Sequence, residues 1–201
     1  MATHHSLAMV PRNAALARST KLLPYLPPEE IALLENAAAR APRKGDRDSL
    51  LIAVLFQVGL RASEVTRITP NHLELFEGKP VLRLIVKGHK QHVMSVPEPL
   101  ANRLHAYAFR NGLTKSDQFF PVNRQRVWQI VKRAARDAGI GKRVYPHLLR
   151  HSDAIERARQ LRHPKALQEH FGWSSPYMVM RYLSTLQQED ALRINQEVRF
   201  D

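Results

Sequence analysis

Six side chains suited to cutting a phosphodiester follow one another along the chain. They supply two guanidiniums, an ammonium, an imidazole, an indole and a phenol, on Arg61, Lys87, His147, Arg150, Trp173 and Tyr182. Arginine forks bind phosphate oxygens in pairs and keep their charge, and a tyrosine hydroxyl can attack phosphorus once it is activated. The set therefore predicts phosphoryl transfer to tyrosine, a reaction that needs no metal ion.

The two arginines have the clearest expected task. A phenol with a pKa of about 10 is a poor nucleophile at neutral pH, and the attacked phosphate gains charge that fixed donors stabilise. We expect Arg61 and Arg150 to clamp the phosphate oxygens. Glu64 follows Arg61 by one helical turn and is expected either to orient it or to pair with it on a helix surface.

The order and spacing of these residues resemble the catalytic domain of the tyrosine recombinase (phage integrase) family. The matching segments are Gly59-Leu-Arg61-Ala-Ser-Glu64, Val86-Lys87-Gly-His-Lys90, His147-Leu-Leu-Arg150-His151, and Phe171-Gly-Trp173 through Arg181-Tyr182. Successive members of the set lie 26, 60, 3, 23 and 9 residues apart. The resemblance runs from about residue 25 to the C-terminus.

The resemblance implies a role for the lysine and the histidine. Lys87 would protonate the leaving 5′-oxygen from the turn of a predicted hairpin, with Lys90 as the competing lysine. His147 would act as an acid or base on the tyrosine side and contact the phosphate. His151 is expected to support the site or to be structural.

The resemblance also selects the nucleophile. Trp173 occupies a position where many members have histidine, and its indole N–H can hold a phosphate oxygen but cannot transfer a proton. Tyr182, nine residues beyond Trp173, is the expected nucleophile, whereas Tyr177 is expected to pack or to contact the backbone.

A metal site is the competing interpretation of the histidines. His147 and His151 lie four residues apart and resemble half of a zinc site, but no third ligand follows at a suitable spacing and no His-Glu-X-X-His motif occurs. The sequence therefore predicts neither a metal nor another cofactor.

The charge of the chain favours a polyanionic partner. Thirty-one Lys and Arg against eighteen Asp and Glu give a formal charge of +13, and residues 121–165 carry twelve basic residues against three acids. A solvated basic face, a ribosome-like protein or a membrane-surface protein would show similar charge. With the motifs, double-stranded DNA is the expected partner, and its expected contacts are Lys90, Arg124, Arg126, Lys132, Arg133, Lys142 and Arg143.

The cysteine content and the hydropathy of the chain indicate its cellular compartment. The chain has no cysteine, which excludes disulfides and thiolate chemistry. Its longest apolar run, 50–56, is too short to cross a bilayer, and the N-terminus lacks the layout of a signal peptide. We expect a cytoplasmic protein without membrane contact.

The elements predict a mainly α fold with a small antiparallel β-sheet (α+β). An arm or linker over 1–24 precedes a helix from Pro28, with Ile31, Leu33, Leu34 and Ala37 or Ala38 on its apolar face. A buried helix over 46–58 and a short helix carrying Arg61 and Glu64 follow. Strands over 81–86 and 91–96 form the one expected hairpin. Further helices are expected at 97–110, 124–138, 146–160, 164–171, 175–182 and 187–198.

The expected organisation is a catalytic domain over 25–183 and a tail helix over 184–201, packed on its own body or exchanged between protomers. Too few residues precede residue 25 for the family's usual N-terminal core-binding domain, so we expect either a short member, like the fimbrial phase-variation invertases, or a truncated form.

The resemblance implies a site-specific DNA recombinase that works through a 3′-phosphotyrosyl intermediate in integration, excision or inversion. Two to four copies on DNA, with an accessory DNA-bending protein, are the expected assembly. A topoisomerase that reseals the same strand and a catalytically silent DNA-binding accessory protein are the alternatives.

Overall fold

The structure is a computed structural model that describes residues 24–86, 90–160, 163–185, 190, 192 and 195–196. Its regular elements, in chain order, are α1 (Pro28–Ala39), α2 (Gly45–Gln57), α3 (Ala62–Val65), the 3₁₀ turn η2 (Pro70–His72), β1 (Leu73–Phe76), β2 (Lys79–Val86), β3 (Lys90–Ser95), α4 (Glu98–Arg110), α5 (Arg124–Asp137), α6 (Pro146–Gln160), α7 (Pro164–Phe171) and α8 (Pro176–Leu183). The predicted fold class, mainly α with a small antiparallel sheet, is confirmed.

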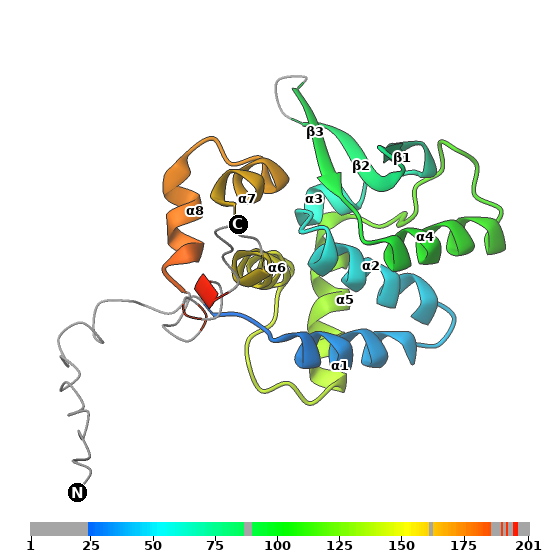
Figure 1. The fold of residues 1–201 in the computed structure, drawn as a ribbon. Helices are drawn as coiled ribbons and strands as arrows, with labels where there is room; N and C mark the ends of the chain where they lie inside the picture. Colours follow the sequence, from blue (N-terminus) through cyan, green and yellow to red (C-terminus); the bar gives the residue numbers. More distant parts are fainter. Residues whose placement is uncertain are drawn as a thin grey trace, which may run out of the picture.

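Helix α6 lies between two groups of elements (Figure 1). On one side are α1, α2, α4, α5 and the sheet, and on the other are α7 and α8. The first half of α6 contributes Leu148 and Leu149 to the larger apolar core, while Ala154 and Ile155 belong to a second cluster with residues of α7 and α8. Residues near the middle of α6 therefore sit at the junction of two packed bodies.

The sheet contains one strand more than the sequence predicts. β2 pairs antiparallel with β3 in the predicted hairpin and with β1 in a second hairpin. The second hairpin turns at Glu77 and Gly78, both with positive φ (49° and 75°). Asparagine or aspartate usually precedes glycine in such turns, so Glu77-Gly78 gives a weak signal. This is why β1 was missed.

Two further expectations about the N-terminal half are wrong. Leu33 was placed on the buried face of α1, yet it is 53% exposed, because it is two residues and about 200° from Ile31 around the helix. Arg61 was placed inside a short helix, but it is the extended residue that precedes α3, with φ −72° and ψ 154°. The difference matters because an extended residue can direct its side chain away from the helix.

The ends of the chain lie mostly outside the described residues. The expected arm over 1–24 is described only at residue 24. Of the tail helix expected over 184–201, residues 184 and 185 form a turn after α8, and residues 190, 192, 195 and 196 are helical. None of the helices in the described residues is long and apolar enough to span a membrane.

A side chain at Gly59 would collide with residues of α6 and α7, so replacing this glycine should destabilise the fold. Its φ is +67°, and a Cβ atom there would lie 2.5 Å from Asp153 Oδ2 and 2.5 Å from Phe171 Cε1. We expect Gly59→Ala to lower the free energy of unfolding by roughly 2–4 kcal/mol through strain and overpacking. Gly112→Ala is the matched control, because Gly112 has φ +61° and open space at the Cβ position. Urea unfolding of both variants checks this, and equal losses would contradict it.

Candidate active site

Arg150 is buried at the junction of the two bodies and is held by backbone carbonyls. Its side chain is 3% exposed. Nη1 donates to the carbonyl of Gly59, and Nη2 donates to that of Phe171 at 2.9 Å. Burial, reinforced by the charge of Arg61, lowers its pKa to about 10, so the guanidinium remains charged at neutral pH. The carbonyl of Gly59, after α2, and that of Phe171, at the end of α7, therefore orient one fixed cation.

Arg61 is the more exposed of the two arginines and is oriented by Glu64. The Glu64 carboxylate accepts hydrogen bonds from the Arg61 guanidinium at 2.7 Å and from the Arg61 backbone N–H at 2.7 Å. Burial alone would raise the pKa of Glu64, but the hydrogen bonds and charge of Arg61 outweigh it and lower the pKa. The Arg61 side chain is 48% exposed. Glu64 thus fixes Arg61 while leaving its guanidinium open to solvent.

Tyr182 is buried in a stack of aromatic rings. It is 2% exposed, and its ring lies parallel to that of Trp173, with centroids 4.8 Å apart and an interplanar angle of 3°. Trp173 stacks in turn on Phe171 at 4.7 Å, and the Arg150 guanidinium lies 4.9 Å from the centroid of the Phe171 ring. The stack places Tyr182 and Arg150 on one cluster although they come from different helices.

His151, rather than His147, contacts the tyrosine hydroxyl. The Oη of Tyr182 and Nδ1 of His151 form a hydrogen bond. His147 is exposed on the first turn of α6, and its ring packs edge-on against His151 with centroids 4.3 Å apart. The acid or base role expected of His147 stays a prediction, and the residue in contact with the tyrosine hydroxyl is its neighbour His151. The signal was in the sequence, since His151 lies one turn beyond His147.

Burial and surrounding charge set the protonation of this cluster. Burial raises the pKa of Tyr182, while Arg150 and Arg181 act in the opposite direction. Burial, with the charges of His147 and Arg181, lowers the pKa of His151 to about 4. The imidazole is therefore neutral at neutral pH, and its Nδ1 can accept the phenol's hydrogen.

The buried His151 should make stability depend on pH in a mildly acidic range. Its ordinary pKa is 6.5, so between about 6.5 and 4 the unfolded chain binds the proton more readily than the folded one. The free energy of unfolding is therefore unaffected by the titration of His151 above pH 6.5 and falls by up to roughly 3 kcal/mol as the pH decreases from 6.5 to 4. We expect His151→Asn to flatten this slope in urea unfolding and His105→Asn, at an exposed position of α4, to leave it. Equal slopes for wild type and His151→Asn would contradict this assignment.

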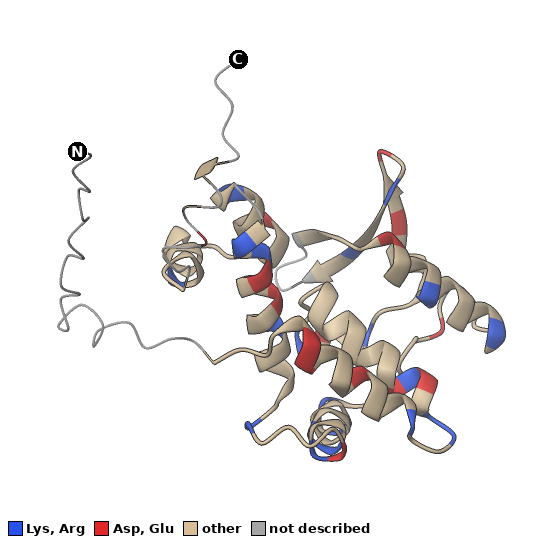
Figure 2. Ribbon diagram, turned by 60° about the horizontal axis from the view of Figure 1, so that its bottom comes forward, with Lys and Arg blue, Asp and Glu red and all other residues tan. Residues whose placement is uncertain are grey.

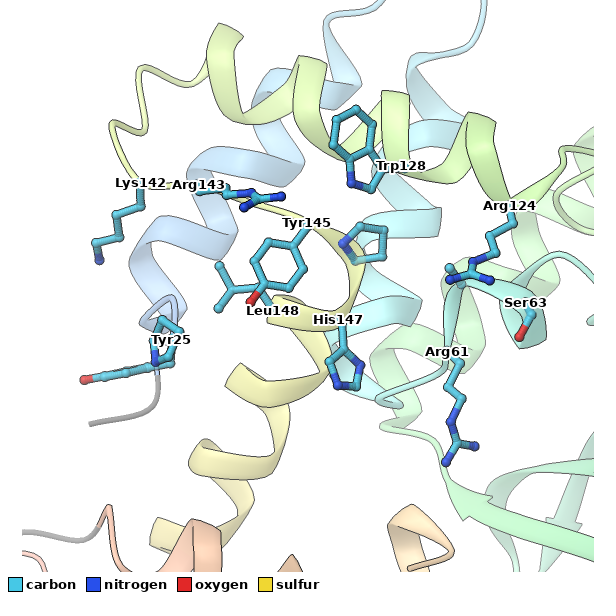
Figure 3. Close-up of a pocket in the computed structure, with 13 residues that line it drawn as sticks. Tyr25, Arg61, Ser63, Arg124, Trp128, Lys142, Arg143, Tyr145, His147 and Leu148 are labelled. Carbon is cyan, nitrogen blue, oxygen red and sulfur yellow. The ribbon is translucent and has the colours of Figure 1, made fainter. Parts of the chain in front are cut away.

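An open cleft is lined in part by Arg61 and His147 (Figure 3). It has a volume of about 1180 Å³, and its wall combines cations with aromatic rings. The side chains of Arg61 and His147 extend in the same direction at one end of it, while Trp128 lies at the opposite wall. The charged and aromatic residues lining it are Tyr25, Arg61, Arg124, Trp128, Lys142, Arg143, Tyr145 and His147. The lining contains no carboxylate among the described residues.

The seven expected DNA contacts separate into groups. Three of them, Arg124, Lys142 and Arg143, line the cleft, and Lys142 also pairs with Glu30 at 2.8 Å. Arg133 donates to the fully buried Asp48 at 2.6 Å and thus links α5 to α2. Arg133 therefore has a structural partner, which the charge count did not reveal.

The remaining expected contacts lie away from the cleft lining or have undescribed side chains. Lys132 covers the Trp128 ring at 5.0 Å, and Arg126 donates to Gln129 at 3.1 Å. Lys90 opens β3, but its side chain is outside the description. Lys and Arg elsewhere are spread over most helices with acids among them (Figure 2), so total charge alone does not locate a binding face.

Three sequence expectations remain to be placed. Lys87 lies outside the described residues, between β2 and β3. Tyr177 was expected to pack or to contact the backbone. Its side chain is 75% exposed on α8, and its backbone N–H donates to Ser175 Oγ. Among the described residues, no group of three or more His, Asp or Glu side chains is placed to hold a metal ion. The aromatic residues of the cleft, Tyr25, Trp128 and Tyr145, were missed, because neither their spacing nor a motif connects them.

Most of the chain is similar to known proteins. Two relatives are a tyrosine recombinase of Pseudothermotoga lettingae, 28% identical over 188 residues that make up 92% of this chain and 63% of that protein, and the tyrosine recombinase XerA of Thermococcus kodakarensis, 32% identical over 67% of this chain and 49% of that protein. The chain thus spans about half to two thirds of these relatives' length.

Solved structures share the fold. The XerA recombinase matches with a TM-score of 0.70 and 23% identity over 89% of this chain and 67% of that one. The catalytic domain of bacteriophage HP1 integrase matches with a TM-score of 0.62 and 20% identity, over 87% of this chain and 96% of that domain. A family model described as the phage integrase family matches residues 24–189. The chain therefore belongs to the phage integrase family, the tyrosine recombinases.

Proposed function

We propose that the chain is the catalytic part of a site-specific DNA recombinase in which Tyr182 attacks the scissile phosphate. The observation that carries the proposal is the row formed by Arg150, Phe171, Trp173 and Tyr182, in which successive groups lie 4.7–4.9 Å apart. These residues come from α6, the end of α7, the loop after it, and α8. Their common location gives a nucleophile, an aromatic support and a phosphate-binding cation in one place.

The proposed chemistry follows from the positions of the charges. Arg150 and Arg61 bind the non-bridging oxygens and stabilise the charge that develops on them. The oxygen of Tyr182 forms a bond to phosphorus, and the bond to the 5′-oxygen breaks. The product is a 3′-phosphotyrosyl link and a 5′-hydroxyl. Attack by the 5′-hydroxyl of a partner duplex then releases Tyr182. Because the link keeps the energy of the phosphodiester, no nucleotide cofactor is needed.

The proton transfers are assigned to one histidine, His151, and to one lysine, Lys87. The neutral His151 accepts the phenol's proton at Nδ1, and His147, which contacts its ring, is exposed to solvent and binds the phosphate. Lys87 protonates the leaving 5′-oxygen. Trp173 supports the tyrosine ring by stacking, and Glu64 orients Arg61.

Attack requires a rearrangement at α8. Tyr182 is 2% exposed and its hydroxyl is occupied by His151, so a phosphate held by the half-exposed Arg61 does not reach it in this arrangement. We infer that DNA binding shifts α8 and releases the phenol. The apolar cluster that holds α8 is the smaller of the two. Moving α8 therefore costs less free energy than opening the larger core.

Double-stranded DNA is the proposed substrate. Arg124, Lys142 and Arg143 continue the positive charge of the clamp along the cleft and would contact the phosphate backbone. Two structural neighbours are complexes with DNA. They are the XerH recombinase bound to a difH substrate and a lambda integrase dimer bound to a core site. By analogy, the proposed working unit contains two or more copies of the chain on DNA.

Trapping of a covalent adduct tests the proposal. Duplexes from the flanks of the gene, with a nick beside each candidate cleavage point, lose the short fragment that carries the 5′-hydroxyl, so the reaction cannot reverse. We expect an SDS-stable adduct on the strand whose 3′-end faces the cut, formed equally in EDTA. An adduct on the 5′-side, or one abolished by EDTA, would contradict the mechanism. Plasmid relaxation with no recombinant products would favour the topoisomerase alternative.

A further inference from the structure

Two buried polar groups behind Arg150 have no hydrogen-bond partner in the described structure. Oδ2 of Asp153 and Nε2 of His170 face each other at 3.9 Å, and their residues are 4% and 8% exposed. Buried polar groups are nearly always hydrogen-bonded, since an unpaired one costs about 1–3 kcal/mol. An unmatched pair at this distance therefore calls for a functional explanation.

The pair connects the two backbone segments that hold Arg150. Asp153 Oδ2 lies 2.5 Å from the position that a Cβ on Gly59 would take, and Gly59 supplies one carbonyl to Arg150. His170 immediately precedes Phe171, which supplies the other carbonyl. A contact between Asp153 and His170 thus sets the spacing between the two acceptors of the Arg150 guanidinium.

Arg157 and β3 complete this cluster. Arg157 donates to Asp153 Oδ1 at 2.8 Å and to the carbonyl of Gln57 at 2.7 Å. On β3, Ser95 Oγ lies 3.4 Å from His170 Nδ1, and His92 Nε2 lies 3.1 Å from the His170 carbonyl. The cluster therefore also ties the end of α7 to the hairpin.

We propose that Asp153 and His170, which face each other across 3.9 Å, are positioning residues that set the placement of Arg150 for phosphate binding. The inference rests on the proposed function, because Arg150 matters in this way only if it binds the scissile phosphate. Neither residue touches the reacting atoms. They act through the carbonyls of Gly59 and Phe171.

Burial and the surrounding charges place the titration of Asp153 near neutral pH. Burial raises the pKa of Asp153 to about 7 against the opposing effects of Arg157 and Arg150, while Glu156 adds to the rise. Burial lowers the pKa of His170 to about 3, helped by Arg157 and by His92 on β3, against the carbonyl of Val58. Below about pH 7 the pair holds one proton, and above it the Asp153 carboxylate is ionised.

The ionised form should hold Arg150 better. One turn of α6 separates Asp153 from Arg150, so its negative charge balances the guanidiniums of Arg150 and Arg157. Protonation removes that balance and leaves like charges close together. Phosphate binding by Arg150 should therefore improve as the pH rises through about 7.

The test compares wild type with Asp153→Asn, which keeps the acceptor for Arg157 but cannot titrate. Single-turnover cleavage of the nicked duplexes is measured at saturating DNA, one pH unit below and above 7. We expect similar rates at the lower pH and a variant slower by about three- to tenfold at the higher pH, the size of one lost hydrogen bond. Glu169→Gln, an exposed acid beside His170, should match wild type at both. A rate ratio that does not change with pH would overturn the proposal.

A readout without DNA separates this inference from the proposed function. The Nε–H resonance of Arg150 in ¹H–¹⁵N spectra, identified by its loss in Arg150→Lys, should shift with a midpoint near pH 7 in wild type and not in Asp153→Asn. If wild type cuts no DNA but the resonance titrates, the pairing holds and the proposed function fails. A resonance that does not titrate refutes the pairing. Should Asp153→Asn fold poorly, the double variant Asp153→Asn/His170→Gln replaces it, because its two amides can bond without a titratable proton.

Discussion

Tyr182→Phe should abolish the covalent DNA adduct while leaving DNA binding unchanged. The substitution removes only the hydroxyl, and the phenylalanine ring can keep the stack with Trp173 at 4.8 Å. Without the Tyr182 hydroxyl no bond from this residue to phosphorus can form, so we expect the rate of adduct formation to fall by more than about 10⁴-fold. SDS gels of the nicked duplexes measure the adduct, and gel shifts measure binding.

Tyr177→Phe is the matched control for this experiment. Tyr177 lies on the same helix five residues earlier, but its side chain is 75% exposed and outside the stack. We expect its adduct to form at the wild-type rate. Loss of the adduct in Tyr177→Phe with retention in Tyr182→Phe would reverse the assignment. Retention in both would exclude either tyrosine as the nucleophile.

The two arginines should fail in different ways. Arg61→Ala and Arg150→Ala should each slow cleavage by about 10²–10³-fold, because each removes a fixed donor to the phosphate. Only Arg150→Ala should also destabilise the fold, by roughly 2 kcal/mol, since it leaves the carbonyls of Gly59 and Phe171 unpaired in a buried place. Arg61 is half-exposed, and its buried partner Glu64 keeps the hydrogen bond from the backbone N–H of residue 61, so the loss of the Arg61 side chain should cost about 1 kcal/mol.

Cleavage assays with urea unfolding of both variants separate the two effects. Glu35 and Arg103 form an exposed ion pair on α1 and α4, so Arg103→Ala controls for the loss of one positive charge far from the clamp. A stability loss for Arg61→Ala as large as that for Arg150→Ala would contradict the anchoring described for Arg150. Full cleavage by either clamp variant would remove that arginine from the mechanism.

Much of the fold could be predicted because its signals are local. Pro28 with Glu29 and Glu30 begins α1 as expected, and glycines at 59 and 172 follow helix ends with φ +67° and +60°. Arg61, Arg150 and Tyr182 stand in short motifs, and the order of these motifs can be read from the sequence without knowledge of the fold. The errors at Leu33 and β1 came from local patterns that were too short to decide.

Partnerships between helices could not be predicted in the same way. Whether His147 or His151 meets Tyr182 depends on the rotation of α6 against α8, and one helical turn changes the answer. The approach of Asp153 to His170 likewise depends on how α6 packs against α7. Arg133 looked like a DNA contact, because a charge count cannot show that the buried Asp48 accepts its hydrogen bond.

Mapping the phosphotyrosine is the most direct test of the central claim. The trapped adduct is digested with nuclease and trypsin and sequenced by mass spectrometry. Trypsin cuts after Arg181, so the account predicts a nucleotide linked through its 3′-phosphate to the first residue of peptide 182–193. A nucleotide on another residue, or one linked through its 5′-phosphate, would contradict the assignment of Tyr182 and the mechanism built on it.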